Sequence, residues 1–324
     1  MAAVKSAALK GLRLLDPVLA LGLAAPACAM RLARRIRLER LPLTQRTLLA
    51  LGVMPLHDHY YDPQFRPNGL TPDDLLRDRP LPGLDLRLEA QRALLAGFRF
   101  QEELADIPFA GPGRPGGAYW FDNGFFERMD GSLWYSMLRS LKPRLIIEVG
   151  SGFSTLMARR ALARNESEGA PRARHICIEP FENPWLEGSG AEVVRQPVER
   201  VDPAMFAQLG ANDVLFIDSS HVIRPGGDVT TEMLQILPRL APGVVAHLHD
   251  IFTPKDYPWH WLFVEHRLWN EQYLLEALLT DNPRFEVMLG ARHAFDAAEA
   301  DVRAACVPLG DQAAGSSFYV RRLG

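Results

Sequence analysis

From residue 119 onward, the apolar positions follow two alternating patterns, the short runs of buried strands and the wider spacing of helices. The runs that predict strands are RLIIEV (144–149), ARHICIEP (173–180), AEVVRQP (191–197), NDVLFID (212–218), GVVAHLHD (243–250), RFEVML (284–289) and SSFYVRRL (316–323). The segments that predict helices are GSLWYSMLRSLKP (131–143), STLMARRALARN (154–165), TEMLQILPRL (231–240) and WLFVEHRLWNEQYLLEALLT (261–280). This alternation predicts an α/β fold with a doubly wound, mostly parallel sheet of seven strands.

The chain before residue 118 has a different pattern. Residues 42–93 are rich in proline, which favours an irregular, turn-rich conformation. The segment 84–107 has the apolar spacing of a helix, and a stretch rich in glycine and proline follows from Pro108 to Gly117. We therefore predict a domain boundary there, with a helical, turn-rich N-terminal extension over 1–118 and the sheet domain over 119–324.

Charge is distributed unevenly along the 324 residues. The total is -3, but residues 1–46 hold nine Lys and Arg against Asp16 and Glu39, a net charge of +7, so the remainder carries -10. A mildly acidic chain gives no reason to expect a nucleic-acid partner. Three widely spaced cysteines without a C-x-x-C motif favour a reducing compartment, and we expect the protein in the cytoplasm.

Residues 14–30 are apolar apart from Asp16 and contain two prolines. Because about 20 apolar residues are needed to cross a bilayer, this segment is short for a transmembrane helix. Two alternatives stay open: contact of residues 1–46 with an anionic membrane surface, and packing on the body of the protein. A cleaved secretion signal is less favoured, because an arginine cluster follows the small-residue sequence Ala27-Cys28-Ala29 at once.

The turn after the first predicted strand identifies a cofactor class. It contains Glu148, Gly150, Ser151 and Gly152, but the third glycine of the dinucleotide pattern G-x-G-x-x-G is absent. A carboxylate directly before the glycines would repel a pyrophosphate, which binds the bare N–H groups of a helix N-terminus. It suits a cationic ligand such as S-adenosylmethionine, which carries a sulfonium and an ammonium group.

Residues 119–324 resemble the class I methyltransferases that use S-adenosylmethionine, which have a Rossmann-like fold. E-V-G-S-G at 148–152 is similar to their first motif, and LFIDSSH (215–221) and VVAHLHDIF (244–252) resemble motifs of a branch with many O-methyltransferases. The resemblance implies cofactor contacts from Glu148, Gly150, Ser151, Gly152 and Asp218, and it implies that Glu179 binds both ribose hydroxyls. Two departures are Ser154 at the family's third glycine position and a spacing of 29 residues from Gly150 to Glu179.

Three side chains follow the fourth and fifth predicted strands and could carry the chemistry. Asp218 and Asp250 could share Mg²⁺ or another divalent cation, which favours carboxylate oxygens. His221 could act as the base that takes a proton from an acceptor hydroxyl. The resemblance implies such an arrangement for metal-dependent O-methyltransferases, but a third metal ligand is not evident and a metal-free reaction stays open. We expect the acceptor to be a small molecule or a glycan.

Two other functions remain as alternatives. His247, His249 and Asp250 could bind the metal of a hydrolase, because alternate strand residues share a face. The fold could also serve as a non-catalytic module that binds S-adenosylmethionine. Away from these motifs, the polar cluster His57, Asp58, His59 and Tyr60 is a candidate lid over the site. Aromatic residues near the predicted site are candidates for pocket walls, namely Tyr119, Trp120, Phe121, Tyr257, Trp259 and Trp261.

Overall fold

The computed structural model describes residues 2–56, 63, 66, 67, 69–112, 117–181, 183–310 and 315–324, and for residues 2–14 it describes the backbone alone. The chain divides into two compact units, Met1–Gly69 and Leu70–Gly324. The cluster His57, Asp58, His59 and Tyr60 lies outside the described residues.

The second unit contains a sheet whose described strands follow the order β3-β2-β1-β4-β5-β7-β6. The strands are β1 (Leu145–Val149), β2 (Arg174–Ile178), β3 (Glu192–Val194), β4 (Val214–Ile217), β5 (Val245–Leu248), β6 (Phe285–Gly290) and β7 (Phe318–Arg322). β7 runs antiparallel to both β5 and β6, and the other neighbouring strands are parallel. The predicted doubly wound, mostly parallel sheet of seven strands is therefore confirmed.

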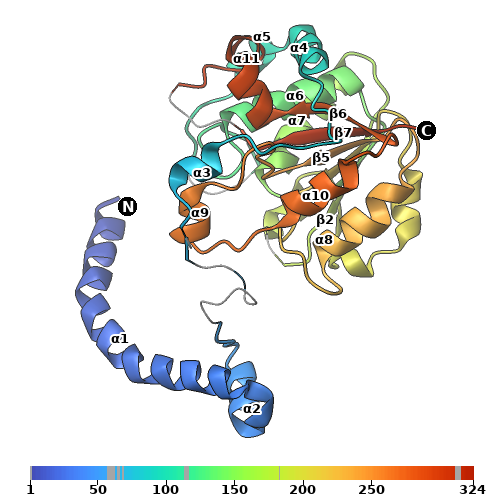
Figure 1. Cartoon of the computed structure of the whole chain (residues 1–324). Helices are drawn as coiled ribbons and strands as arrows, with labels where there is room; N and C mark the ends of the chain where they lie inside the picture. The colour runs from blue at the N-terminus through green and yellow to red at the C-terminus, as the bar shows by residue number, and fades with distance from the viewer. Residues whose placement is uncertain are drawn as a thin grey trace. The chain divides into compact units, whose positions relative to one another are not determined.

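Helices cover both faces of this sheet (Figure 1). They are α3 (Pro72–Leu76), α4 (Leu88–Gly97), α5 (Gln101–Ala105), α6 (Arg128–Leu141), α7 (Phe153–Ser167), α8 (Asp228–Thr231), α9 (Trp259–Phe263), α10 (Glu271–Leu279) and α11 (Ala291–Ala305). Shorter helical turns are Pro184–Gly188, Val198–Arg200, Pro203–Gln208, Glu232–Ile236 and Leu237–Arg239. α11 is a helix that the sequence pattern did not predict.

Alternate strand residues divide between two hydrophobic cores, as the period of two along a strand requires. Ile146 and Phe216 belong to the core formed with α4, α6, α7 and α11. Ile147 and Ile217 belong to the opposite core, which includes residues of α8 and α10. The central strands are buried on both faces, which explains their continuous apolar sequences.

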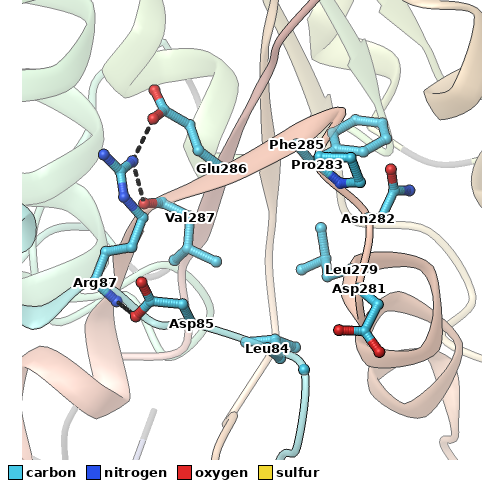
Figure 2. Close-up of a pocket in the computed structure, with 11 residues that line it drawn as sticks. Leu84, Asp85, Arg87, Leu279, Asp281, Asn282, Pro283, Phe285, Glu286 and Val287 are labelled. Atoms are coloured by element: carbon cyan, nitrogen blue, oxygen red, sulfur yellow. Dashed lines mark hydrogen bonds and ion pairs between the residues drawn. The ribbon is translucent and has the colours of Figure 1, made fainter.

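Residues 70–112 pack on the sheet, so the chain divides near Gly69 and not at the predicted position 118. The Gln91 side-chain oxygen accepts a hydrogen bond from the Gly290 amide at 3.0 Å. Figure 2 shows Arg87 reaching from this segment to Glu286 and to the carbonyl of Val287 on β6. A surface pocket of about 350 Å³ lies between the two segments. These contacts make residues 70–112 part of the sheet domain.

Two predicted helices are each divided in the structure. The segment 84–107 forms α4 and α5, and the segment 261–280 forms the end of α9 and then α10. The second break follows from the local backbone, since His266 has a φ of 54° and Asn270 a φ of -153°. The backbone amides of Asn270 and Glu271 instead donate to the carbonyl of His221, at 3.0 and 3.2 Å. The break therefore fixes the start of α10 beside His221.

The first unit contains α1 (Ala2–Ile36), a short turn Leu38–Arg40, and α2 (Pro42–Ala50). α1 continues through Pro17 and Pro26. Among the side chains described in residues 15–69, Ala33 and Leu38 alone are buried. Segment Leu15–Ile36 is long and apolar enough to cross a membrane.

Candidate active site

The carboxyl ends of the central parallel strands meet at one edge of the sheet. The strand order reverses between β1 and β4, and ligands of such sheets bind at this point. The ladder continues one residue past the strands, because the Asp218 amide donates to Val149 O and the His249 amide to Ile217 O, each at 2.9 Å. The predicted residues that follow β1, β4 and β5 are thus brought together.

Gly150 and Gly152 serve different purposes in the turn after β1. Gly150 has a φ of +76°, and a Cβ there would lie 1.9 Å from the carbonyl oxygen of Asp218. Gly152 has extended backbone with a φ of -170°, and the nearest atom to an added Cβ is Asn183 Nδ2 at 4.0 Å. Gly150 therefore lets β1 and β4 approach each other, whereas Gly152 leaves space open for a ligand.

A cleft of about 370 Å³ opens beside this turn, within the size range of small-molecule sites. It is lined by Phe125, Phe126, Gly150, Ser151, Gly152, Phe153, Ser154, Glu179, Asn183 and Asp218. The Glu179 carboxylate accepts hydrogen bonds from the amides of Ser151 and Phe181, at 3.3 and 3.0 Å. The structure thus places five of the six predicted cofactor residues around one cleft: Gly150, Ser151, Gly152, Glu179 and Asp218.

Glu148, the sixth, lies beneath the turn instead of in the cleft. Its side chain is fully buried, and its two oxygens accept hydrogen bonds from Ser154 Oγ at 2.6 Å and Thr155 Oγ1 at 2.7 Å. His175 Nε2 lies 3.0 Å from the same carboxylate. Buried carboxylates need such partners. Glu148 thus ties β1 and β2 to the first turn of α7, and its contact with the cofactor stays a prediction.

His221 is held between carboxylates past the end of β4. Its Nδ1 lies 2.8 Å from Glu271 Oε2 on α10, and its Nε2 lies 3.3 Å from Asp218 Oδ1 and 3.8 Å from Asp250 Oδ2. The ring also packs on Trp269, with centroids 4.2 Å apart. Because Glu271 occupies Nδ1, Nε2 is the nitrogen turned toward Asp218 and the cleft that Asp218 lines.

Two residues of this group have left-handed backbone conformations, His221 with a φ of 59° and Asp250 with a φ of 58°. Such conformations are uncommon outside glycine, although His and Asp tolerate them better than most residues. They cluster at functional sites when the surrounding structure fixes them. At His221, the backbone is held in this conformation by the two hydrogen bonds from the start of α10 to its carbonyl.

The charges of the group affect one another strongly. Burial alone would lower the pKa of His221, but the hydrogen-bonded carboxylates of Asp218 and Glu271 raise it well above its ordinary value. For Asp218, burial works against ionisation, and the imidazoles of His249 and His221 overcome it and lower the pKa. Burial raises the pKa of Asp250. The unliganded site therefore favours a protonated His221 beside an ionised Asp218.

His249 forms the inner wall of the group. Its Nδ1 lies 3.5 Å from Asp218 Oδ1 and 3.6 Å from Asp250 Oδ1, and its Nε2 lies 3.3 Å from Ser316 Oγ. Asp130 on α6 lies behind it at 3.7 Å and accepts hydrogen bonds from the amides of Ser316 and Ser317. These contacts connect the end of β5 to the segment before β7 and to α6.

The hydrolase alternative is not supported by the position of His247. This residue is fully buried, stacks on Tyr319 with centroids 4.0 Å apart, and lies 2.9 Å from Ser317 Oγ through Nε2. Burial lowers its pKa well below the ordinary value, so it is neutral. His247 and His249 do share a face, since both rings contact Phe126. His247 is a core residue, however, and is enclosed away from Asp250.

The atoms that could hold a divalent cation belong to Asp218, His221 and Asp250. One ligand atom from each lies within 4.8 Å of the others. Two carboxylates and an imidazole fit a divalent metal by their chemistry. A second group of this kind among the described residues, Glu148, His175 and Cys177, is completely buried under the glycine turn.

Several residues of the site carry no evident sequence signal. Glu271 and Asp130 are acids within helical patterns, where a charged residue is usually solvent-exposed. Trp269 lies in a segment predicted as helix. Asn183, whose side chain donates to Ser151 O at 2.7 Å, belongs to an Asn-Pro turn, and that turn is the one signal that could have indicated it. Of the aromatic candidates, Tyr119, Trp120, Phe121 and Tyr257 are buried, and Trp259 and Trp261 are half-buried.

Part of the sheet domain resembles known proteins in sequence. Residues 147–251 match the profile of a protein family described as a methyltransferase domain. An uncharacterized protein of Archaeoglobus fulgidus is 29% identical over 140 residues, which is 42% of this chain and 62% of that protein. The chain thus spans about three fifths of the length of this relative.

One solved structure, described as "cmcI-D160 Mg-SAM", matches with a TM-score of 0.36 and 14% identity, over 84% of this chain and 97% of that one. Such a distant likeness assigns neither ligand nor substrate. The methyltransferase-domain match over residues 147–251 confirms the predicted resemblance. The part of the sheet domain over residues 147–251 is thus similar to a methyltransferase domain.

Proposed function

We propose that this chain, whose residues 147–251 are similar to a methyltransferase domain, transfers a methyl group from S-adenosylmethionine to a hydroxyl oxygen, with His221 as the base. The acceptor is a small molecule or a glycan. The observation that carries the proposal is the orientation of His221: Glu271 holds Nδ1 at 2.8 Å, and Nε2 is turned toward Asp218, which lines the cofactor cleft.

The cleft beside β1 would hold the cofactor through the turn Gly150–Gly152 and through Glu179. When bound, S-adenosylmethionine supplies an electrophilic methyl group on its sulfonium. The Glu179 carboxylate is anchored at the cleft by two backbone amides, and a carboxylate in this position would accept hydrogen bonds from the ribose hydroxyls. Asp218 lies at the same cleft and adds negative charge that favours a cationic ligand.

His221 would receive the acceptor proton at Nε2. Glu271 fixes the tautomer and stabilises the imidazolium that forms, as a carboxylate does for a histidine base in other enzymes. Because the neighbouring carboxylates raise the pKa of His221, the base form requires added positive charge near Asp218 and Asp250. A cationic cofactor provides such charge, so binding and base activation are linked.

Asp218 and Asp250 would hold a divalent cation, which would lower the pKa of a bound acceptor hydroxyl. The two carboxylates fit such an ion, and His221 Nε2 would stay unligated beside them to act as the base. The reaction with His221 alone as the base uses the same residues without the ion. Removal of the metal should stop the reaction that uses the ion and leave the reaction with His221 alone unchanged.

An aromatic wall adjoins His221 and is suited to an acceptor ring. Trp269 and Trp261 lie with centroids 5.1 Å apart, and the Arg267 guanidinium stacks on both, at 4.5 Å from Trp261 and 4.9 Å from Trp269. All three side chains are half-buried. Stacking on a sugar or an aryl ring would place a hydroxyl of the acceptor near Nε2.

The test uses methyl-labelled S-adenosylmethionine, purified protein and extract of the native host as the source of acceptor. A placed base contributes about 10²–10⁴-fold, so His221→Asn should lower labelled product by that factor and leave cofactor affinity nearly unchanged. His293→Asn, on α11 at the far edge of the sheet, is the matched control and should retain activity.

Equal product from His221→Asn and wild type would reject His221 as the base. EDTA followed by Mg²⁺ or Mn²⁺ tests the metal: loss and recovery of activity supports the ion at Asp218 and Asp250, and full activity after stripping rejects it. Absence of labelled product from any extract, with intact cofactor binding, would favour the non-catalytic alternative.

A further inference from the structure

The helices of the first unit expose an unusual amount of apolar surface. On α1 the exposed large side chains are Leu15, Val18, Leu19, Leu21, Leu23, Leu32 and Ile36. On α2 and the residues after it they are Leu43, Leu49, Leu51, Val53, Met54 and Leu56. Burying one such side chain is worth about 1.5–3 kcal/mol, so leaving all of them in water forgoes a large stabilisation. A contiguous apolar surface of this kind marks a site of interaction.

The charged residues within residues 15–36 of α1 gather on one side of the helix. At about 100° per residue, Asp16, Arg31, Arg34 and Arg35 fall within a sector of about 100°. The exposed large apolar residues of α1 occupy the remaining sector. A helix with one apolar side and one cationic side is suited to lie along a membrane interface, with its apolar side among the acyl chains.

The length of the uncharged run distinguishes lying in the interface from crossing the membrane. Between Asp16 and Arg31 the uncharged residues are 17–30, which at 1.5 Å per residue extend about 21 Å. The hydrocarbon core of a bilayer is about 30 Å thick. The uncharged run is therefore shorter than the hydrocarbon core, and the longer segment Leu15–Ile36 could cross only with charged residues placed inside that core.

The charge of the first unit selects the kind of lipid. Residues 1–46 carry a net charge of +7, and Arg31, Arg34, Arg35, Arg37 and Arg40 follow the uncharged run directly. Basic residues near an anionic membrane surface each contribute about 1 kcal/mol of attraction. α2 adds exposed apolar residues, since none of its residues, all of which the structure describes, is buried. α2 lies beyond any cleavage near Ala27-Cys28-Ala29, whereas the apolar residues of α1 from Leu15 to Leu23 precede it.

We propose that α1 and α2 attach the protein to the surface of a lipid bilayer with anionic headgroups, with α1 parallel to the interface. The apolar residues of both helices enter the acyl boundary, and the arginines from Arg31 to Arg46 contact the headgroups. The attachment is independent of methyl transfer. It uses residues that the site in the second unit does not use.

Flotation of the full chain with vesicles tests this attachment. Vesicles of phosphatidylcholine alone are compared with vesicles in which about one third is phosphatidylglycerol. Wild type should float with the anionic vesicles, poorly with the neutral ones, and less well at high salt, which screens the attraction. The triple variant Arg31→Glu, Arg34→Glu, Arg35→Glu should bind anionic vesicles about 100-fold more weakly or worse.

A second variant, Leu19→Glu with Leu23→Glu, tests the apolar side and should also lose at least about 10-fold. Leu234→Glu, at an exposed leucine of the second unit, is the matched control and should float like wild type. Thermal unfolding of each variant verifies that the sheet domain is intact.

Several results would overturn the proposal: failure of wild type to float with anionic vesicles, equal flotation of wild type and both α1 variants, or protein from the host that lacks residues 1–30. Resistance of the host protein to alkaline extraction from membranes would replace the interfacial helix with a membrane-spanning one.

Discussion

In residues 70–324 large side chains such as Trp134, Phe216 and Tyr319 are completely buried, whereas in residues 15–69 Val18 and Leu21 are 69% and 81% exposed. The second unit also pairs its buried charges, as in Glu148 with Ser154 and Thr155. The first unit places its charges on exposed surface beside its apolar residues. The two units therefore differ in how much apolar side-chain surface they leave exposed.

The comparison shows that apolar helix residues can have different roles in one chain, depending on whether they are buried in a core or exposed. α7 and α10 contribute apolar residues to a core, so truncating them changes the folding free energy. α1 carries exposed apolar residues, so under the proposed attachment their truncation should change membrane binding and not folding. The predictions that follow use paired substitutions, one in each unit.

The largest difference in stability between the two units is expected for substitutions of glycines with positive φ. Gly150→Val would place Cβ 1.9 Å from a backbone oxygen, and the cost should reach at least about 4–5 kcal/mol, enough to prevent normal folding of the site. Gly52→Val, at a φ of +69° with no atom within 4 Å of an added Cβ, should leave the main thermal transition unchanged. Equal unfolding temperatures for the two variants would contradict the close approach of β1 and β4.

Core truncation is the next contrast. Trp134→Ala removes a fully buried side chain and should cost about 3–5 kcal/mol in the free energy of unfolding by denaturant. Leu21→Ala should change it by less than about 0.5 kcal/mol, because the side chain is exposed. A cost above 1–2 kcal/mol for Leu21→Ala would mean that α1 packs on the body of the protein.

A smaller contrast involves ion pairs and depends on pH. Partial burial would raise the pKa of Glu103, but hydrogen bonds from Arg139 and Tyr135 lower it below the ordinary 4.5. Its stabilisation is therefore present above pH 4.5 and is lost as the pH falls through the lowered pKa. Glu103→Gln should reduce Tm at neutral pH by about 2–4 °C, and the difference from wild type should vanish in acid.

The matched control is Glu39→Gln in the first unit, where Glu39 and Arg37 are 4.0 Å apart and both mostly exposed. This substitution should not change Tm at any pH, because exposed pairs contribute little. A deficit of Glu103→Gln that persists unchanged at low pH would contradict the assigned ion pair.

The sequence predicts the elements and one edge of the sheet because those features depend on local patterns. Apolar runs followed by Glu179, Asp218 and Asp250 identify the strand ends, and G-x-G identifies the turn. Parallel strands then require these residues to share an edge. This reasoning places the five cleft residues, His221 and Asp250 at one edge, and the family resemblance supplies the cofactor-binding roles.

The remaining features depend on contacts between distant segments. Glu148 has the same sequence context whether it faces a ligand or lies beneath the turn. The hydroxyls of Ser154 and Thr155 hold it beneath the turn by donating hydrogen bonds to its carboxylate. Glu271 lies 50 residues from its partner His221 and occupies a helical pattern in which an acid is normally exposed. The break at 264–270 that brings Glu271 to the site results from tertiary hydrogen bonds to the His221 carbonyl.

The central claim is that the turn after β1 forms a site for S-adenosylmethionine, and calorimetric titration with this compound tests it most directly. Wild type should bind one equivalent. Glu179→Ala should bind about 10- to 100-fold more weakly, because it removes hydrogen bonds from a charged acceptor. Gly152→Val should abolish binding in a folded protein, because its side chain enters the cleft. Glu199→Ala, at an exposed acid, should bind like wild type. Unchanged affinity in both Glu179→Ala and Gly152→Val would contradict the account.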